Sequence, residues 1–117
     1  MLAQLHARPH LILAIVRYQH RLSGSVSQHK AVVTLVDGSK LHINEVWLHG
    51  HLRKYAYYWL SPTNDRIMGW DNAPHHPHIA TSPHHVHTPS GITSSHKSGL
   101  KHVLDELEKR LLSSPHP

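Results

Sequence analysis

Histidine is the residue that best equips this chain for chemistry. Sixteen of its 117 residues are histidine, and six of these fall among the thirteen residues from 75 to 87. An imidazole titrates at about pH 6.5, so it can both accept and donate a proton near neutrality. A single loop histidine is usually just hydrated, but six in thirteen predict a functional site in this segment.

One chemistry that the cluster supports is metal-free cleavage of RNA by general acid–base catalysis. One histidine would take the proton of a 2′-hydroxyl, and another would return a proton to the leaving oxygen. This mechanism requires no cofactor. The candidate catalytic residues are His76, His85, His87, Asp71 and Glu45.

Each of the two carboxylates also has a plainer interpretation. Asp71 would orient a histidine of the cluster, or would only close a turn together with Asn72. Glu45 would act as a base or orient a histidine. Alternatively, Glu45 would form an ion pair with Arg53 or Lys54 across a hairpin. The sequence leaves both pairs of alternatives open.

The second chemistry is metal binding. Imidazoles suit zinc and other transition metals, and Asp71 would add an oxygen ligand. The spacing matches no strong zinc signature, although the His-x-His of residues 85 to 87 would put both rings on one side of an extended chain. The candidate metal ligands are His75, His76, His84, His85 and His87.

Charge favours a polyanionic partner, with RNA as the first candidate. Twelve Lys and Arg residues oppose seven Asp and Glu residues, and the formal net charge is +5. Tyr55, Tyr57 and Trp59 share one face of a predicted strand and are expected to lie in the core. The candidate RNA-binding residues are Arg53, Lys54, Arg66 and Tyr58.

Composition excludes several classes of protein. The chain has no cysteine, which excludes disulfides, thiolate metal sites and cysteine nucleophiles. No apolar run approaches the roughly 20 residues that a membrane helix needs. We therefore expect one cytoplasmic domain over residues 1–117, with no membrane partner.

The pattern of elements predicts an α+β fold that positions the cluster. It consists of an antiparallel four- to five-stranded sheet with a C-terminal amphipathic helix packed on one face. Residues 1–10 are poorly patterned, and the prolines of residues 72–97 predict a His/Pro-rich loop. The predicted strands, within residues 11–71, are 11–22, 30–36, 40–46, 52–60 and 66–71, and the predicted helix is 98–113.

Four motifs together resemble the TumE family of small toxins. They are Leu-His-Ile-Asn-Glu (41–45), Lys-Tyr-Ala-Tyr-Tyr-Trp (54–59), Trp-Asp-Asn-Ala-Pro-His-His-Pro (70–77) and Pro-His-His-Val-His (83–87). The resemblance covers roughly residues 30 to 112. Val86 stands where the family often has a lysine, which weakens any mechanism that needs a cation there. The positions carried over are Glu45, Tyr57, Asp71, Asn72, His75, His76, His84, His85 and His87.

The resemblance implies a toxin of a type II toxin–antitoxin pair, held inactive by a helix-turn-helix antitoxin similar to TumA. Our first hypothesis is an enzyme, a ribonuclease that uses the histidine segment, with His85 and His87 or His76 as acid and base. The alternatives are a metal-binding module without turnover and a domain that only binds an acidic partner. A homodimer is a further possibility. The RNA target and any metal are not encoded in a recognisable way.

Overall fold

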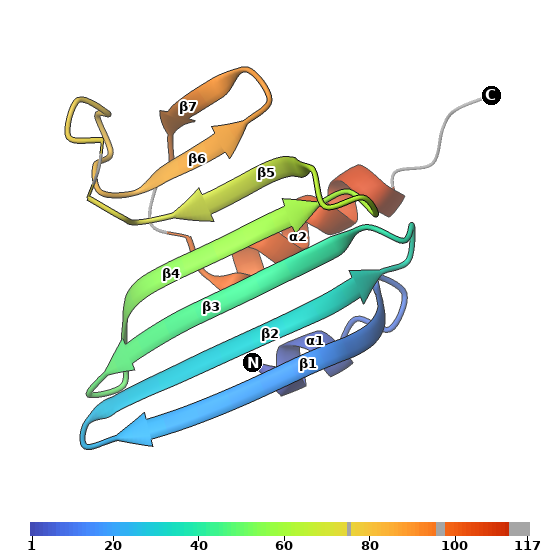
Figure 1. The fold of residues 1–117 in the computed structure, drawn as a ribbon, viewed down its shortest axis with the longest axis horizontal. Helices are drawn as coiled ribbons and strands as arrows, with labels where there is room; N and C mark the ends of the chain where they lie inside the picture. The colour runs from blue at the N-terminus through green and yellow to red at the C-terminus, as the bar shows by residue number, and fades with distance from the viewer. Residues whose placement is uncertain (75, 96–97, 113–117) are drawn as a thin grey trace.

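One antiparallel sheet dominates the computed structural model, which describes residues 1–74, 76–95 and 98–112 (Figure 1). Within these residues the sheet has seven strands, and each strand pairs with the next one in the chain. The strands are β1 Ile12–Ser23, β2 Val26–Leu35, β3 Lys40–Leu48, β4 His51–Leu60, β5 Arg66–Asp71, β6 His85–Thr88 and β7 Gly91–Ser94. The helices are α1 Leu2–His6 and α2 Leu100–Leu112.

The α+β class and the C-terminal helix are confirmed, but the strand number was wrong. The sheet has seven strands instead of four to five, because β6 and β7 form inside the segment 72–97 that was assigned to loop. Proline is excluded only from positions where its missing amide would break the ladder. Pro83 lies just before β6 and Pro89 lies in the turn before β7, so these prolines bound the hairpin without interrupting it.

The first ten residues, which showed no pattern, are tied to the C-terminal helix. They form the short helix α1, and Arg8 follows it. The guanidinium of Arg8 donates to Asp105 Oδ1 at 2.6 Å and to Glu108 Oε2 at 2.7 Å, both on α2. His10 also pairs with Glu108. These long-range ion pairs explain why local sequence gave no hint of order here.

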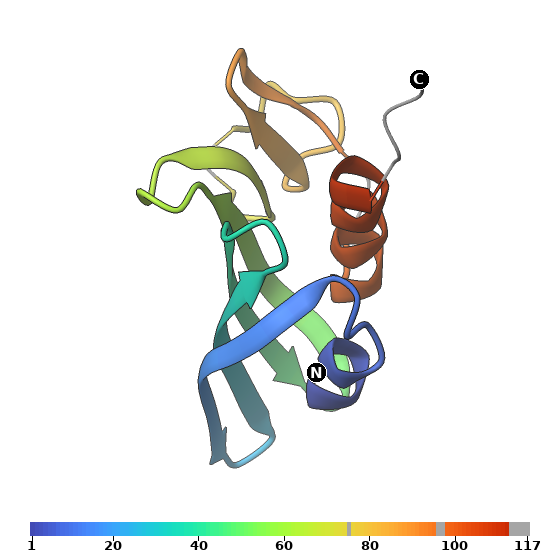
Figure 2. The ribbon, with the colours of Figure 1, turned by 90° about the vertical axis from the view of Figure 1, so that its right-hand side faces the viewer.

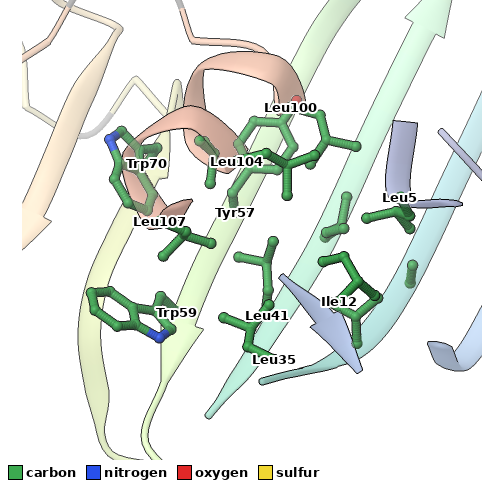
Figure 3. Packing of buried hydrophobic residues seen from close by; sticks show 14 of the residues in the cluster. Leu5, Ile12, Leu35, Leu41, Tyr57, Trp59, Trp70, Leu100, Leu104 and Leu107 are labelled. Atoms are coloured by element: carbon green, nitrogen blue, oxygen red, sulfur yellow. The ribbon is translucent and has the colours of Figure 1, made fainter. Parts of the chain in front are cut away.

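The core lies between one face of the sheet and the two helices (Figure 2). Strand alternation puts Leu41 and Ile43 on this face. The apolar side of α2, with Leu100, Leu104 and Leu107, packs over the same face (Figure 3). Tyr55, Tyr57 and Trp59 are all buried here, as predicted. We call this side of the sheet the helix face.

The opposite side of the sheet is not covered by either described helix, and we call it the open face. No helix among the described residues is long and apolar enough to cross a membrane. The open face carries the residues that alternate with the core positions. They include Lys30, His42, Asn44, Ala56, Tyr58 and Asp71.

Candidate functional site

Pairing between β5 and β6 brings the acidic and histidine motifs together. His85 lies opposite Asp71 in the ladder, and His87 lies opposite Gly69. Residues two apart in a strand share a face, so the side chains of Asp71, His85 and His87 all project from the open face. His85 Nε2 lies 2.7 Å from Asp71 Oδ1, and His87 Nε2 lies 2.9 Å from Asp71 Oδ2.

The Asp71 carboxylate is fully hydrogen-bonded. Its Oδ1 accepts from the Ala73 amide at 3.0 Å as well as from His85, and its Oδ2 accepts from the Tyr58 hydroxyl at 2.6 Å as well as from His87. Burial alone would raise the pKa of Asp71, but the bonds from Tyr58 and Ala73 and the neighbouring His85 outweigh it and leave the pKa below its ordinary value. Asp71 therefore both caps a turn and orients two histidines, the two roles that the sequence offered as alternatives.

The position of His85 limits its protonation state. Its Nδ1 lies 2.9 Å from the Pro83 carbonyl oxygen, which can only accept, so Nδ1 must carry a proton. Its Nε2 faces Asp71 Oδ1, a second acceptor. The same Nε2 also lies 3.1 Å from His87 Nε2, so Asp71 and the two imidazole rings form one connected group. The His85 side chain is only 2% exposed, so Asp71 and His87, and not solvent, are the partners of its Nε2.

Tyr58 can reach Asp71 because the residue opposite it on β5 is Gly69, which has no side chain. A Cβ added at Gly69 would lie 2.3 Å from Cδ1 of the Tyr58 ring, closer than carbon atoms can approach. The missing side chain lets the ring lie over β5 and point its hydroxyl at Asp71. Burial, together with the bond to Asp71, raises the pKa of Tyr58 to about 12, so the hydroxyl stays a donor at neutral pH.

We expect Gly69→Ala to displace Tyr58 and to lower the free energy of unfolding by about 1–3 kcal/mol, the usual cost of forcing an extra methyl into a packed site. Urea unfolding measures the loss. Gly99→Ala is the control, because a Cβ there meets nothing within 4 Å. A Gly69→Ala variant as stable as wild type would show that the ring does not depend on this gap.

Two further features complete the surroundings of His87. Burial lowers the pKa of His87, Asp71 opposes this, and the positive charge of Arg66 adds to the lowering. The ring of His87 therefore favours its neutral form. The ring of His76 lies 4.9 Å from that of His85 and 6.1 Å from that of His87, between centroids. The structure thus gathers three of the predicted histidines around Asp71.

A groove of two adjoining cavities crosses the open face beside this group. The first has a volume of about 460 Å³ and includes Lys54, Tyr58 and Asp71 in its lining. The second, of about 380 Å³, reaches over β1 and β2 to Arg17 and Lys30. The two cavities share Asn44, Ala56 and Tyr58. Each is of the size of a small-ligand site, at the lower end of a range of roughly 300–1,000 Å³.

Some predicted residues lie away from this site. Glu45 is on the helix face, where it accepts from Tyr57 Oη at 2.6 Å and from Trp47 Nε1 at 3.0 Å, so the expected ion pair with Arg53 or Lys54 is wrong. A buried carboxylate with two neutral donors is a packing element of the core. Alternation in the sequence had placed Glu45 on the same strand face as Leu41 and Ile43, and this indicated that Glu45 lies on the core side.

Other predicted residues divide between the two faces. His84 stacks on Tyr55 and its Nδ1 lies 2.8 Å from the tyrosine hydroxyl, on the helix side. His75 lies outside the described residues. Among the predicted RNA-binding residues, Lys54 and Tyr58 line the first cavity and the guanidinium of Arg66 lies 5.9 Å from the Tyr58 ring centroid, whereas Arg53 lines neither cavity.

The carried-over residues Tyr57 and Asn72 have structural contacts. Tyr57 is fully buried, and burial followed by the nearby Glu45 raises its pKa far above the ordinary value. Asn72 accepts from the Tyr55 amide and donates to the Arg53 carbonyl, which fastens the start of the histidine segment to β4. Sequence reasoning missed the groove residues of β1, β2 and β3, although the alternation of 40–46 had put His42 and Asn44 on one face. The missed lining residues are Arg17, Gln19, Lys30, His42 and Asn44.

Fold and site together define a small α+β protein with a carboxylate–histidine centre at the end of a groove. The family model described as toxin TumE matches residues 2–111, so the chain belongs to this toxin family. The match extends well before residue 30, where the resemblance was expected to begin. No curated protein and no solved structure matches the chain. Membership of a toxin family implies an antitoxin partner.

Proposed function

We propose that this toxin cleaves RNA on the open face of its sheet, by general acid–base catalysis at the Asp71 group. The observation that carries the proposal is the hydrogen-bonded set of Asp71, His85 and His87 at the end of a groove that contains cationic residues. Acid–base chemistry on RNA needs two proton carriers held in place beside a phosphate-binding surface. His87 of this set and the neighbouring His76 are the proposed carriers, and the groove offers the surface.

The geometry divides the proposed roles among the histidines. His87, whose side chain is 12% exposed, is the base: with Nε2 bonded to Asp71, its Nδ1 takes the proton of the 2′-hydroxyl. The freed oxygen attacks phosphorus, the bond to the 5′-oxygen breaks, and protonated His76 gives that oxygen its proton. The products are a 2′,3′-cyclic phosphate and a 5′-hydroxyl. His85 is too buried to touch RNA, so it positions Asp71.

Cations beside the group have the charge needed to stabilise the transition state. The guanidinium of Arg66 lies 5.9 Å from the ring centroid of Tyr58, whose hydroxyl binds Asp71, and we assign it to the phosphoryl oxygens. Lys54 lines the cavity that contains Asp71 and would hold an adjacent phosphate. Neither role requires the lysine that the family often has where this chain has Val86.

The proposal includes the setting of the toxin. We place its action in the cytoplasm, where RNA is accessible, and we assign its inhibition to a helix-turn-helix antitoxin. Such a partner would stop cleavage either by covering the groove or by moving β6.

Cleavage in the absence of metal is the direct test of the acid–base mechanism. Purified toxin without a histidine tag is incubated with single-stranded RNA in EDTA, and product ends are identified by mass spectrometry. We expect cyclic-phosphate ends and no cleavage by the His85→Ala/His87→Ala variant. RNA binding without any cleavage, with or without added metal, would contradict the proposal.

One observation favours a second candidate, a metal centre at the same residues. Asp71, His85 and His87 each offer a ligand atom, and these atoms lie within 4.8 Å of one another. The hydrogen bond from His85 Nδ1 to a carbonyl is the arrangement that leaves Nε2 free to bind a metal. Zinc held here would supply an activated water molecule. The residues present therefore fit zinc, with three protein ligands and a fourth position left for water.

Metal content separates the two candidates. On the acid–base proposal, untagged protein purified without chelator contains less than about a tenth of an equivalent of zinc or nickel by elemental analysis. About one equivalent of metal, lost in Asp71→Ala but retained in the exposed-carboxylate control Asp65→Ala, would favour the metal centre. Restoration of cleavage by added zinc after EDTA treatment would then assign the metal a catalytic role.

A further inference from the structure

Two rows of side chains cross the open face from the catalytic group to the far edge of the sheet. Cross-strand pairing aligns the first row through Arg17, Val32, His42, Tyr58, Gly69 and His87, on β1 to β6 in order. The same pairing aligns a second row through Gln19, Lys30, Asn44, Ala56, Asp71 and His85. Both rows end in catalytic candidates at β6 and in polar or cationic residues at β1.

The far half of these rows has the chemistry of a nucleotide site. It coincides with the 380 Å³ cavity, and none of the residues that line this cavity is acidic. Arg17 and Lys30 offer positive charge to phosphates, while Gln19 and Asn44 offer amide groups of the kind that hydrogen-bond to base edges. Val32 and Ala56 add small apolar side chains to the lining.

The distribution of charge along the chain also makes the β1 and β2 end of the sheet the more positive end. The first acidic residue is Asp37, so β1 and β2 contain no carboxylate at all. Arg8 is neutralised by α2, but Arg17 and Lys30 lie on the open face at the cavity. A polyanion that reaches Asp71 would therefore gain its strongest additional attraction by extending toward β1.

We infer that the cavity over β1 to β4 is a subsite for the nucleotides that flank the cleaved bond of a single-stranded RNA. The RNA runs across the strands, with its reacting phosphate at His87 and its neighbouring nucleotides over Asn44 and Lys30. Five strand spacings of about 4.8 Å separate β1 from β6, or roughly 24 Å. That length suits about four nucleotides, the smaller size of single-strand sites on β-folds. The inference rests on the proposed RNA cleavage.

Substrate length tests the subsite through cleavage. A dinucleotide and a hexanucleotide with the same cleaved step are compared by kcat/KM. We expect wild type to prefer the hexanucleotide by tenfold or more, and Arg17→Ala/Lys30→Ala to reduce this ratio toward one. Lys101→Ala/Lys109→Ala on α2, with the same change in charge on the other side of the sheet, should keep the ratio. An unchanged ratio in Arg17→Ala/Lys30→Ala, or an equal reduction in the control, would overturn the subsite.

Binding tests the subsite without relying on cleavage. A fluorescent hexanucleotide with 2′-O-methyl groups is titrated at several salt concentrations. Loss of two phosphate contacts in Arg17→Ala/Lys30→Ala should lower the slope of log K against log salt by about 1.4, which is roughly 0.7 for each contact in a single strand. An unaltered slope would overturn the subsite. If wild type and Arg17→Ala/Lys30→Ala differ in this slope but wild type never cleaves RNA, the proposed function would be refuted and the binding subsite would still be supported.

Discussion

His87→Ala should slow RNA cleavage by about 10²–10⁴-fold while the protein remains folded, because this is the usual contribution of a positioned acid or base. His87 is the more exposed of the two histidines that bind Asp71, with 12% of its side chain exposed against 2% for His85, and it projects from the short strand β6. Its removal takes one of four hydrogen bonds from Asp71 and leaves those of His85, Tyr58 and Ala73 in place. Single-turnover cleavage of RNA at saturating enzyme measures the rate directly, and growth of cells that express the variant measures its toxicity.

His51→Ala is the matched control for this variant. His51 is an exposed histidine at the start of β4, and it does not line either cavity of the groove. We expect it to cleave within a factor of about two of wild type. Equal losses in His51→Ala and His87→Ala would show that the total histidine charge matters and not the position of one ring. Full activity in His87→Ala would remove it from the mechanism.

Asp71→Ala should lower the free energy of unfolding by about 3–5 kcal/mol, because it leaves the donors that surround the buried carboxylate without an acceptor, and removing one partner from a buried charged network typically costs this much. The side chains of His85 and Asp71 are 2% and 6% exposed, so water cannot replace the carboxylate. The pKa of Asp71 lies below its ordinary value of about 4. Its contribution to stability is therefore complete above about pH 4 and is lost as the pH falls through the lowered pKa. Urea unfolding at pH 7 measures the loss.

Two further variants separate the lost ion pair from general damage. Asp65→Ala removes an exposed turn carboxylate and should cost less than about 1 kcal/mol. Asp71→Leu/His85→Leu removes both partners and should recover much of the stability without recovering cleavage. A loss below about 1 kcal/mol in Asp71→Ala would contradict a stabilising role for the buried pairing of Asp71 with His85.

The strands that form the floor of the site were predictable because their signals are local. Alternation in 40–46 and the aromatic run 54–59 specify which side chains point to the core, and β3 and β4 begin and end within two residues of the prediction. The same alternation placed His42, Asn44 and Tyr58 on the opposite side. The density of histidines in residues 75–87 singled out the segment as a candidate site, and the structure brings three of them, His76, His85 and His87, close together.

The arrangement of the site was not predictable because it depends on a long-range pairing. Asp71 and His85 are fourteen positions apart and meet only because β6 forms and pairs with β5. Proline content had argued against any strand there, since sequence alone does not tell a proline inside a ladder from one at its end. His84 and His85 point to opposite sides of the sheet, because neighbouring side chains of an extended chain alternate in direction.

Acid–base cleavage of RNA is tested most directly with a substrate whose attacking 2′-hydroxyl is blocked. The hexanucleotide is prepared with a single 2′-O-methyl group at the cleaved step, and untagged toxin is incubated with it and with the unmodified RNA in EDTA. We expect cleavage of the unmodified RNA to a cyclic phosphate. Cleavage of the methylated RNA should be at least a thousandfold slower, because His87 has no 2′-hydroxyl proton to remove. Equal cleavage of both substrates would contradict acid–base attack by the 2′-hydroxyl.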